Sequence, residues 1–132
     1  MSTVENPSTP REVTIIAADD ARRALLRASL EAQGWKVRAE SNGRRVLRGW
    51  SRELATPFLF IDLDENDLDA FELLAGVAAH RIAPRVLAAA RAELADALRP
   101  LGVEAVVAPH GRFAEIAQAL EGLRVGAIIR AA

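Results

Sequence analysis

The chain has 132 residues, the size of one ordinary domain, and 51% of them are hydrophobic, which is enough for one buried core. It contains no cysteine, which excludes disulfides, thiolate metal sites and cysteine nucleophiles. Seventeen basic and eighteen acidic residues give a formal net charge of -1, so no excess of positive charge indicates a nucleic-acid partner.

The two ends of the chain differ in composition from its centre. Residues 1–11 are polar and lack the apolar stretch of a signal peptide, and we interpret them as a flexible arm. Residues 12–124 are the predicted folded domain, and residues 125–132 form an apolar tail. No run of about 18 apolar residues occurs, so we expect no membrane span and, by default, a cytoplasmic protein.

Short apolar runs alternate with longer segments of helical spacing along the chain. The predicted strands are 13–18, 35–40, 58–61, 85–90 and 104–108. The predicted helices are 21–33, 42–54, 69–81, 92–99 and 111–123. Within the first helix, Leu26 and Leu30 lie four positions apart, and Gly34 follows the helix in the manner of a C-terminal cap.

Strands and helices that alternate in this way are typical of an α/β fold with a parallel sheet between two layers of helices. Right-handed crossovers leave few topologies, and the flavodoxin-like (βα)5 sandwich with strand order 2-1-3-4-5 is common at this size. Its ligand site lies at the carboxyl ends of the first and third strands. Here those ends are residues 17–20 and 62–64.

The segment from Phe58 to Leu63, followed by Leu68 to Leu74, resembles the third strand and third helix of a CheY-like response-regulator receiver domain. In that family the strand ends in the phosphorylated aspartate, and a second aspartate opens the next helix seven residues later. Asp62 and Asp69 match this spacing, and the similarity of element order covers about residues 13–123. The resemblance implies that Asp62 is the phosphoacceptor-type residue.

An acidic pair at the end of the first strand binds Mg²⁺ in the resembling family. Aligned through the first helix, those positions fall on Ala17 and Ala18, and Asp19 and Asp20 come just after them. The favoured interpretation is that Asp19 and Asp20 are the N-cap and first-turn acid of that helix. The alternative is that Asp19, Asp20 and Asp64 form a residual acidic pocket around Asp62.

Two further features of the resembling family are missing. Its receivers place a Ser or Thr at the end of the fourth strand, but this chain has none after Thr56. They place a Lys at the end of the fifth strand, but the only lysine here is Lys36. Phosphoryl transfer depends on positioning and charge stabilisation, so these losses predict a degenerate receiver, or pseudo-receiver, that needs no cofactor and binds Mg²⁺ weakly. The resemblance also predicts a cis peptide bond before Pro109.

A calcium loop is the main alternative for the acidic segment, because Asp62, Asp64 and Asn66 match the first positions of an EF-hand. The sixth and twelfth positions are Asp67 and Leu73, where an EF-hand needs Gly and Glu. An apolar strand, in place of a helix, precedes the loop. We therefore exclude an EF-hand and expect no metal site and no enzymatic activity.

Two functional hypotheses remain. The first is a stand-alone signal-transduction module that binds a kinase, an output protein or itself without phosphorylation. The second is a working phosphoacceptor, modified on Asp62 in a two-component phosphorelay. The resemblance places partner binding, or a homodimer, on helix 4, strand 5 and helix 5. We call the residues there the predicted interaction face: Leu94, Leu98, Arg99, Arg112 and Glu115. The alternative for Leu94 and Leu98 is that both leucines face the sheet.

Overall fold

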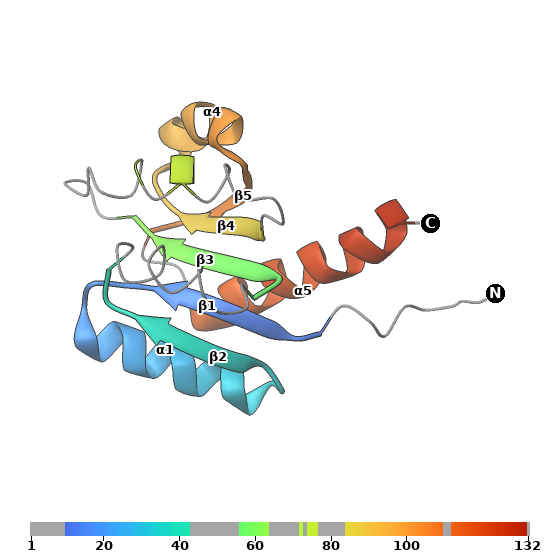
Figure 1. Cartoon of the computed structure of the whole chain (residues 1–132). Helices are drawn as coiled ribbons and strands as arrows, with labels where there is room; N and C mark the ends of the chain where they lie inside the picture. The colour runs from blue at the N-terminus through green and yellow to red at the C-terminus, as the bar shows by residue number, and fades with distance from the viewer. Residues whose placement is uncertain are drawn as a thin grey trace.

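The computed structural model describes residues 10–42, 56–63, 72, 74–76, 84–109 and 112–131. Its centre is a parallel sheet of five strands in the order β2-β1-β3-β4-β5, which confirms the predicted topology (Figure 1). The strands are β1 Glu12–Ile16, β2 Lys36–Glu40, β3 Phe58–Asp62, β4 Arg85–Ala89 and β5 Val103–Val107. The helices are α1 Asp20–Ala32, η1 Ala92–Leu94, α4 Ala95–Leu98, η2 Arg99–Leu101 and α5 Phe113–Ala131.

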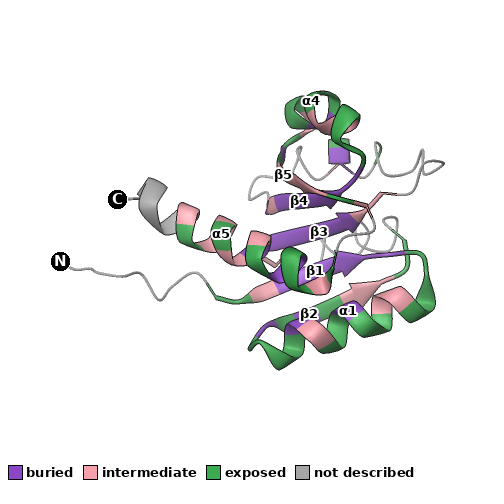
Figure 2. Cartoon of the chain, turned by 180° about the vertical axis from the view of Figure 1, so that it is seen from behind, coloured by how far each residue is buried: buried purple, intermediate pink, exposed green. Residues whose placement is uncertain are grey.

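The central strands β1, β3 and β4 are mostly apolar because both of their faces are covered. Every residue of 58–61 in β3 is at most 1% exposed, and β1 and β4 are buried over most of their length (Figure 2). The edge strands β2 and β5 are less buried: each has one buried residue, and its other residues are half-buried or exposed. This difference between central and edge strands is typical of a parallel sheet enclosed between helices.

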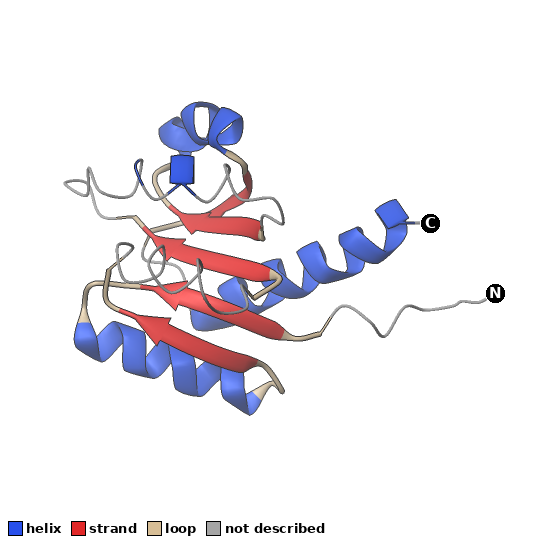
Figure 3. Cartoon of the chain, viewed as in Figure 1, coloured by secondary structure: helices blue, strands red, loops and turns tan. Residues whose placement is uncertain are grey.

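Helices α1 and α5 cover one face of the sheet, and α4 covers the other (Figure 3). Leu26 and Leu30 of α1 and Ile116 and Leu120 of α5 pack on the first face, against side chains of β1, β3 and β4. Leu98 of α4 packs on the second face. The two apolar faces of the sheet therefore produce two separate core clusters.

Most predicted elements agree with the structure to within about two residues at each end. Two predictions are wrong. Helix α5 does not end at Leu123 but runs to Ala131, so the backbone of residues 125–131 continues the helix, and its last turns lie beyond the amino ends of the strands (Figure 1). No peptide bond between described residues is cis, so the bond between Ala108 and Pro109 is trans. The predicted helix 42–54 and most of 69–81 lie outside the described residues.

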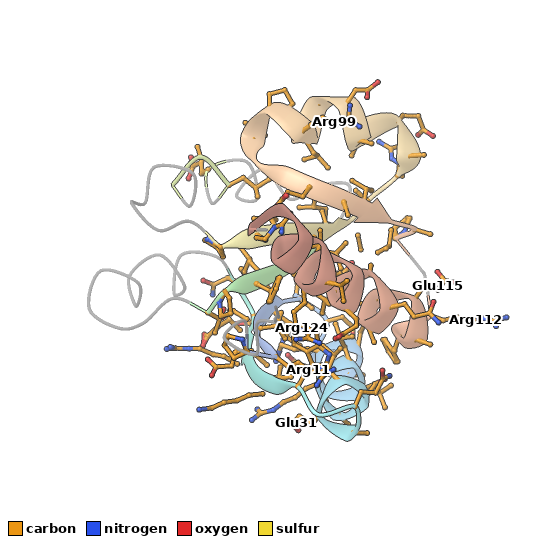
Figure 4. The ribbon with its side chains drawn as sticks, turned by 90° about the vertical axis from the view of Figure 1, so that its right-hand side faces the viewer. Arg11, Glu31, Arg99, Arg112, Glu115 and Arg124 are labelled. Atoms are coloured by element: carbon orange, nitrogen blue, oxygen red, sulfur yellow. The ribbon has the colours of Figure 1, made fainter. Side chains whose placement is uncertain are left out.

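At the amino ends of the strands, arginine side chains fix α5 to the sheet. Glu121 of α5 accepts hydrogen bonds from Arg124 on the same helix and, at 3.1 Å, from Arg11 before β1. Figure 4 labels the two arginines. Arg85, the first residue of β4, donates to the carbonyl oxygen of Leu123 at 3.3 Å.

No helix among the described residues is long and apolar enough to cross a membrane.

Glu121 gives the fold a predictable dependence on pH. Hydrogen bonds from Arg124 and Arg11 lower its pKa from 4.5 to about 2, against the opposing effect of burial. Because the folded-state pKa lies below the unfolded value, the ionised carboxylate stabilises the fold above pH 4.5, and this contribution is lost as the pH falls toward 2. The side chain is 34% exposed, so screening reduces the contribution to about 1 kcal/mol.

We expect Glu121→Gln to lower the free energy of unfolding by about 1 kcal/mol at neutral pH, and the difference from the unmodified protein to shrink through the pH range between the unfolded and folded pKa values. Urea unfolding at a series of pH values measures this. Glu93→Gln, which changes an exposed carboxylate on η1, is the matched control. A Glu121→Gln difference that stays constant as the pH falls would contradict the assignment.

Candidate functional site

Asp62 lies at the carboxyl end of β3, between the ends of β1 and β4. Its sheet neighbour on β4 is Ala89, whose carbonyl oxygen accepts a hydrogen bond from the amide of Leu63 at 2.9 Å. The next amide, that of Ala90, donates to Val107 at the end of β5 at 3.0 Å. The parallel register therefore brings the ends of β3, β4 and β5 to one edge of the sheet, where ligand sites of such folds lie.

The Asp62 carboxylate is paired with an arginine of its own chain. Arg22 of α1 donates from Nε to Asp62 Oδ2 at 2.7 Å, and the two side chains are 22% and 17% exposed. Arg22 Nη2 also lies 3.4 Å from the carbonyl oxygen of Pro109, and its guanidinium carbon lies 5.4 Å from the centre of the Phe113 ring. We call these four residues, Arg22, Asp62, Pro109 and Phe113, the Asp62 site.

The first turn of α1 fixes where the Arg22 side chain begins. Asp19 is the N-cap of α1, and its Oδ1 accepts a hydrogen bond from the Arg22 amide at 2.8 Å. Asp20 pairs with Arg23 at 2.6 Å, and Arg23 Nη1 donates to the carbonyl oxygen of Ala17 at 2.8 Å. The structure therefore confirms the favoured interpretation of Asp19 and Asp20 as residues of the helix start.

The residual acidic pocket is not assembled by the residues that the structure describes. Asp19 and Asp20 have the helix amide and Arg23 as partners, and Asp62 has Arg22. Asp64, the remaining member of that predicted pocket, lies outside the described residues. Within the described part of the chain, no group of three or more His, Cys, Asp or Glu side chains is placed to bind a metal ion.

The ends of β4 and β5 carry only small or aliphatic side chains. Ala89 and Ala90 follow one another at the end of β4, and Ala108 and Pro109 follow β5. The only lysine of the chain, Lys36, begins β2 and therefore lies at the amino ends of the strands. Neither strand end provides the hydroxyl or amine that binds a phosphoryl oxygen in the resembling family.

Solved structures resemble this one over most of its length. The receiver domain of Francisella response regulator 1452 matches with a TM-score of 0.78 and 15% identity, over 89% of this chain and 98% of that one. The chemotaxis response regulator CheY4 of Vibrio cholerae matches with a TM-score of 0.75 and 14% identity, over 86% and 98% of the two chains. No protein-family model and no curated protein matches the sequence.

A third similar structure is the receiver domain of sensor histidine kinase PA1611 from Pseudomonas aeruginosa PAO1, with a magnesium ion coordinated in its active site cleft. It matches with a TM-score of 0.71 and 17% identity, over 87% of this chain and 98% of that one. The strand order of the sheet and the three similar structures agree on the fold of this chain. The chain has the receiver fold.

Within the receiver fold, the predicted interaction face is only partly exposed. Leu98 is 0% exposed and belongs to the core cluster on the second face of the sheet, so it cannot contribute to an exposed surface. Leu94 is half-buried against the same cluster. Arg99 at the start of η2, Arg112 just before α5 and Glu115 in the first turn of α5 are exposed (Figure 4). The burial of Leu98 and the packing of Leu94 agree with the alternative that these leucines face the sheet.

The sequence analysis did not identify Arg22, which pairs with Asp62, or Phe113, whose ring lies under the Arg22 guanidinium. A signal for Arg22 was present: Arg22 and Arg23 stand in the first turn of a helix, where the helix dipole disfavours cations. Two adjacent arginines at such a place need acidic partners nearby. The structure supplies Asp62 for one and Asp20 for the other.

Proposed function

We propose that this chain is a non-enzymatic, cytoplasmic signal-transduction module that binds a partner protein independently of phosphorylation. The observation that carries the proposal is the chemistry of the strand ends beside Asp62. Ala89 and Ala90 stand at the end of β4, and Ala108 and Pro109 stand after β5, in a fold that this chain shares with the response regulators compared above. These residues offer no side-chain donor to a phosphoryl group.

Electrostatics explains why those residues matter. A phosphoryl group on a carboxylate adds roughly -1.5 to -2 charges at neutral pH. Transfer of the group is accelerated almost entirely by positioning and by cations and hydrogen-bond donors that stabilise its charge. Asp62 already has Arg22 as its counter-charge, and the acids Asp19 and Asp20 have partners of their own. Among the described residues, the ends of β4 and β5 therefore supply no hydroxyl or amine to a phosphoaspartate, and Arg22 is already paired with Asp62.

A working phosphoacceptor is the second candidate, and one observation favours it. Asp62 is retained at the end of β3, 17% exposed, and Arg22 is a cation within hydrogen-bond distance of its carboxylate. In this alternative, Arg22 would stabilise the phosphoryl charge and Asp62 would be modified in a two-component phosphorelay. A phosphoacceptor also needs residues that bind a metal ion, and Asp64, which lies outside the described residues, is one candidate for that role.

The partner in the favoured proposal is a kinase, an output protein or a second copy of the chain. The exposed members of the predicted interaction face, Arg99, Arg112 and Glu115, offer both signs of charge in the segments that precede and follow the edge strand β5. Rim residues of non-obligate interfaces have this mixed character. We include in the proposal a homodimer through α4, β5 and α5, and no nucleic-acid or membrane partner.

We expect Mg²⁺ and acetyl phosphate to leave the intact mass of the protein unchanged, because little offsets the added negative charge at Asp62. Mass spectrometry of the intact chain measures this, and sedimentation of the same samples should show one association state with and without the donor. Asp62→Asn is the matched control. A stoichiometric adduct that disappears in Asp62→Asn would establish the phosphoacceptor in place of the interaction module.

A further inference from the structure

One side chain, that of Arg22, joins segments that are far apart in the sequence. It starts on α1, and its Nε hydrogen-bonds to Asp62 at the end of β3 at 2.7 Å. Its Nη2 lies 3.4 Å from the carbonyl oxygen of Pro109, which follows β5. The guanidinium also covers the ring of Phe113, the first residue of α5. The position of the start of α5 is therefore coupled to the charge pair at Asp62.

The contacts use properties that arginine has and lysine lacks. The guanidinium is a planar fork with several N–H donors, so it can bind a carboxylate and a carbonyl while its flat face lies on an aromatic ring. A lysine ammonium is a point charge and would make one of these contacts at a time. Arg22 makes all of them, with Asp62, Pro109 and Phe113.

The position of Arg22 in α1 also requires an acidic partner, which is Asp62. Arg22 is the third residue of α1, where the partial positive charge of the helix N-terminus disfavours a cation. Asp62 reverses that effect, and because both side chains are less than a quarter exposed, salt screens the pair only partly. Arg22 therefore neutralises the charge of Asp62 as a bound cation would, but it is covalently part of the chain.

We propose that Arg22 is a positioning residue that acts as the permanent counter-ion of Asp62 and fixes the start of α5. The inference deepens the proposed function and depends on it: Arg112 and Glu115, which flank Phe113, are then presented in one arrangement without a phosphoryl group or metal ion. A surface of this kind is constitutive. Its geometry is set when the chain folds, by the Arg22 contacts, and not by a modification of Asp62.

Hydrogen exchange at single amides tests the proposal. The amides of Glu115 and Ile116 both donate to the carbonyl oxygen of Arg112, at 3.0 and 3.3 Å, and report on the first turn of α5. In Arg22→Ala we expect their exchange to accelerate on the order of tenfold, as when one hydrogen bond between charged groups is lost. Arg27→Ala, which removes a pair with Glu31 on the same helix, is the matched control and should leave these amides unchanged.

Two further readouts separate this role from general support of the fold. The Nε–H signal of Arg22 should be observable by NMR in the unmodified protein and should shift in Asp62→Asn. Guanidinium ion added to Arg22→Ala, at concentrations far below those that denature, should restore slow exchange at Glu115 and Ile116, while sodium chloride of equal ionic strength should not. Rescue of this kind requires the cation itself at the Asp62 site.

Either of two outcomes overturns the inference. Exchange at Glu115 and Ile116 that is unchanged in Arg22→Ala would show that α5 is fixed by other contacts. A uniform acceleration along the whole chain, without rescue by guanidinium, would show only a loss of global stability. Both results are independent of the phosphodonor experiment, because an acetyl-phosphate adduct on the unmodified protein would remove the proposed function and leave the exchange data standing.

Discussion

Phe58→Ala is expected to lower the free energy of unfolding by about 3–5 kcal/mol, the usual loss when a buried phenylalanine is truncated. Phe58 is 0% exposed at the start of β3, and its ring meets the edge of Trp35 with centroids 5.7 Å apart. Edge-to-face pairs add about 0.5–1.5 kcal/mol beyond the area that they bury. Because small domains are stable by only about 5–15 kcal/mol, this single change brings the fold near its limit.

Urea unfolding, followed by circular dichroism, measures the loss. Phe58→Leu is the control: it keeps most of the apolar volume and should lose about 1 kcal/mol. If Phe58→Ala is no less stable than Phe58→Leu, the packing of Phe58 in the first core cluster would be wrong.

The strands were predictable because burial on both faces leaves a simple signal. The run from Phe58 to Ile61 is wholly apolar, as expected of a strand that is covered on both faces. The end of α5 was not predictable in the same way. Gly122 and Gly126 weaken helical propensity, yet the helix continues past both, with the ion pair of Glu121 and Arg124 one turn apart on its surface.

The site was predictable in part, and the boundary has a physical cause. Asp62 was found because strand, aspartate and following helix are contiguous in the sequence. Arg22 lies forty positions before Asp62, and no local spacing connects them. Only the sheet order, which sets α1 and β1 beside β3, brings them together. Sequence patterns, which depend on local spacing, therefore identify the acid of the site, Asp62, but not its cation, Arg22.

At both ends of the sheet, arginine side chains attach α5 to the rest of the fold. At the carboxyl ends, Arg22 joins α1 to β3 and to the start of α5. At the amino ends, Arg85 and Arg11 join β4 and the segment before β1 to the second half of α5. In both places, α5 is attached by contacts between side chains and backbone groups of the chain itself. This arrangement agrees with a helix whose surface is presented permanently.

Leu98→Ala is expected to lower the free energy of unfolding by about 2–5 kcal/mol, the range for a buried leucine whose removal leaves a cavity. Leu98 is 0% exposed and packs with the second core cluster, which includes Leu59 and Val103. Its neighbour Arg99 is exposed, and its pair with Asp96 spans 3.7 Å between side chains that are 76% and 94% exposed. Such a pair adds little stability, so Arg99→Ala should change the free energy of unfolding by less than about 0.5 kcal/mol.

Measuring stability and association on both variants separates the core residue of α4, Leu98, from the surface residue that follows it, Arg99. In the proposed interaction module, Arg99→Ala weakens association measured by sedimentation while leaving urea unfolding unchanged. Leu98→Ala does the reverse at temperatures where it stays folded, because a residue without exposed surface has no direct contact with a partner. If Leu98→Ala retains full stability but loses association, Leu98 is a contact residue and α4 must turn its leucine outward when the partner binds.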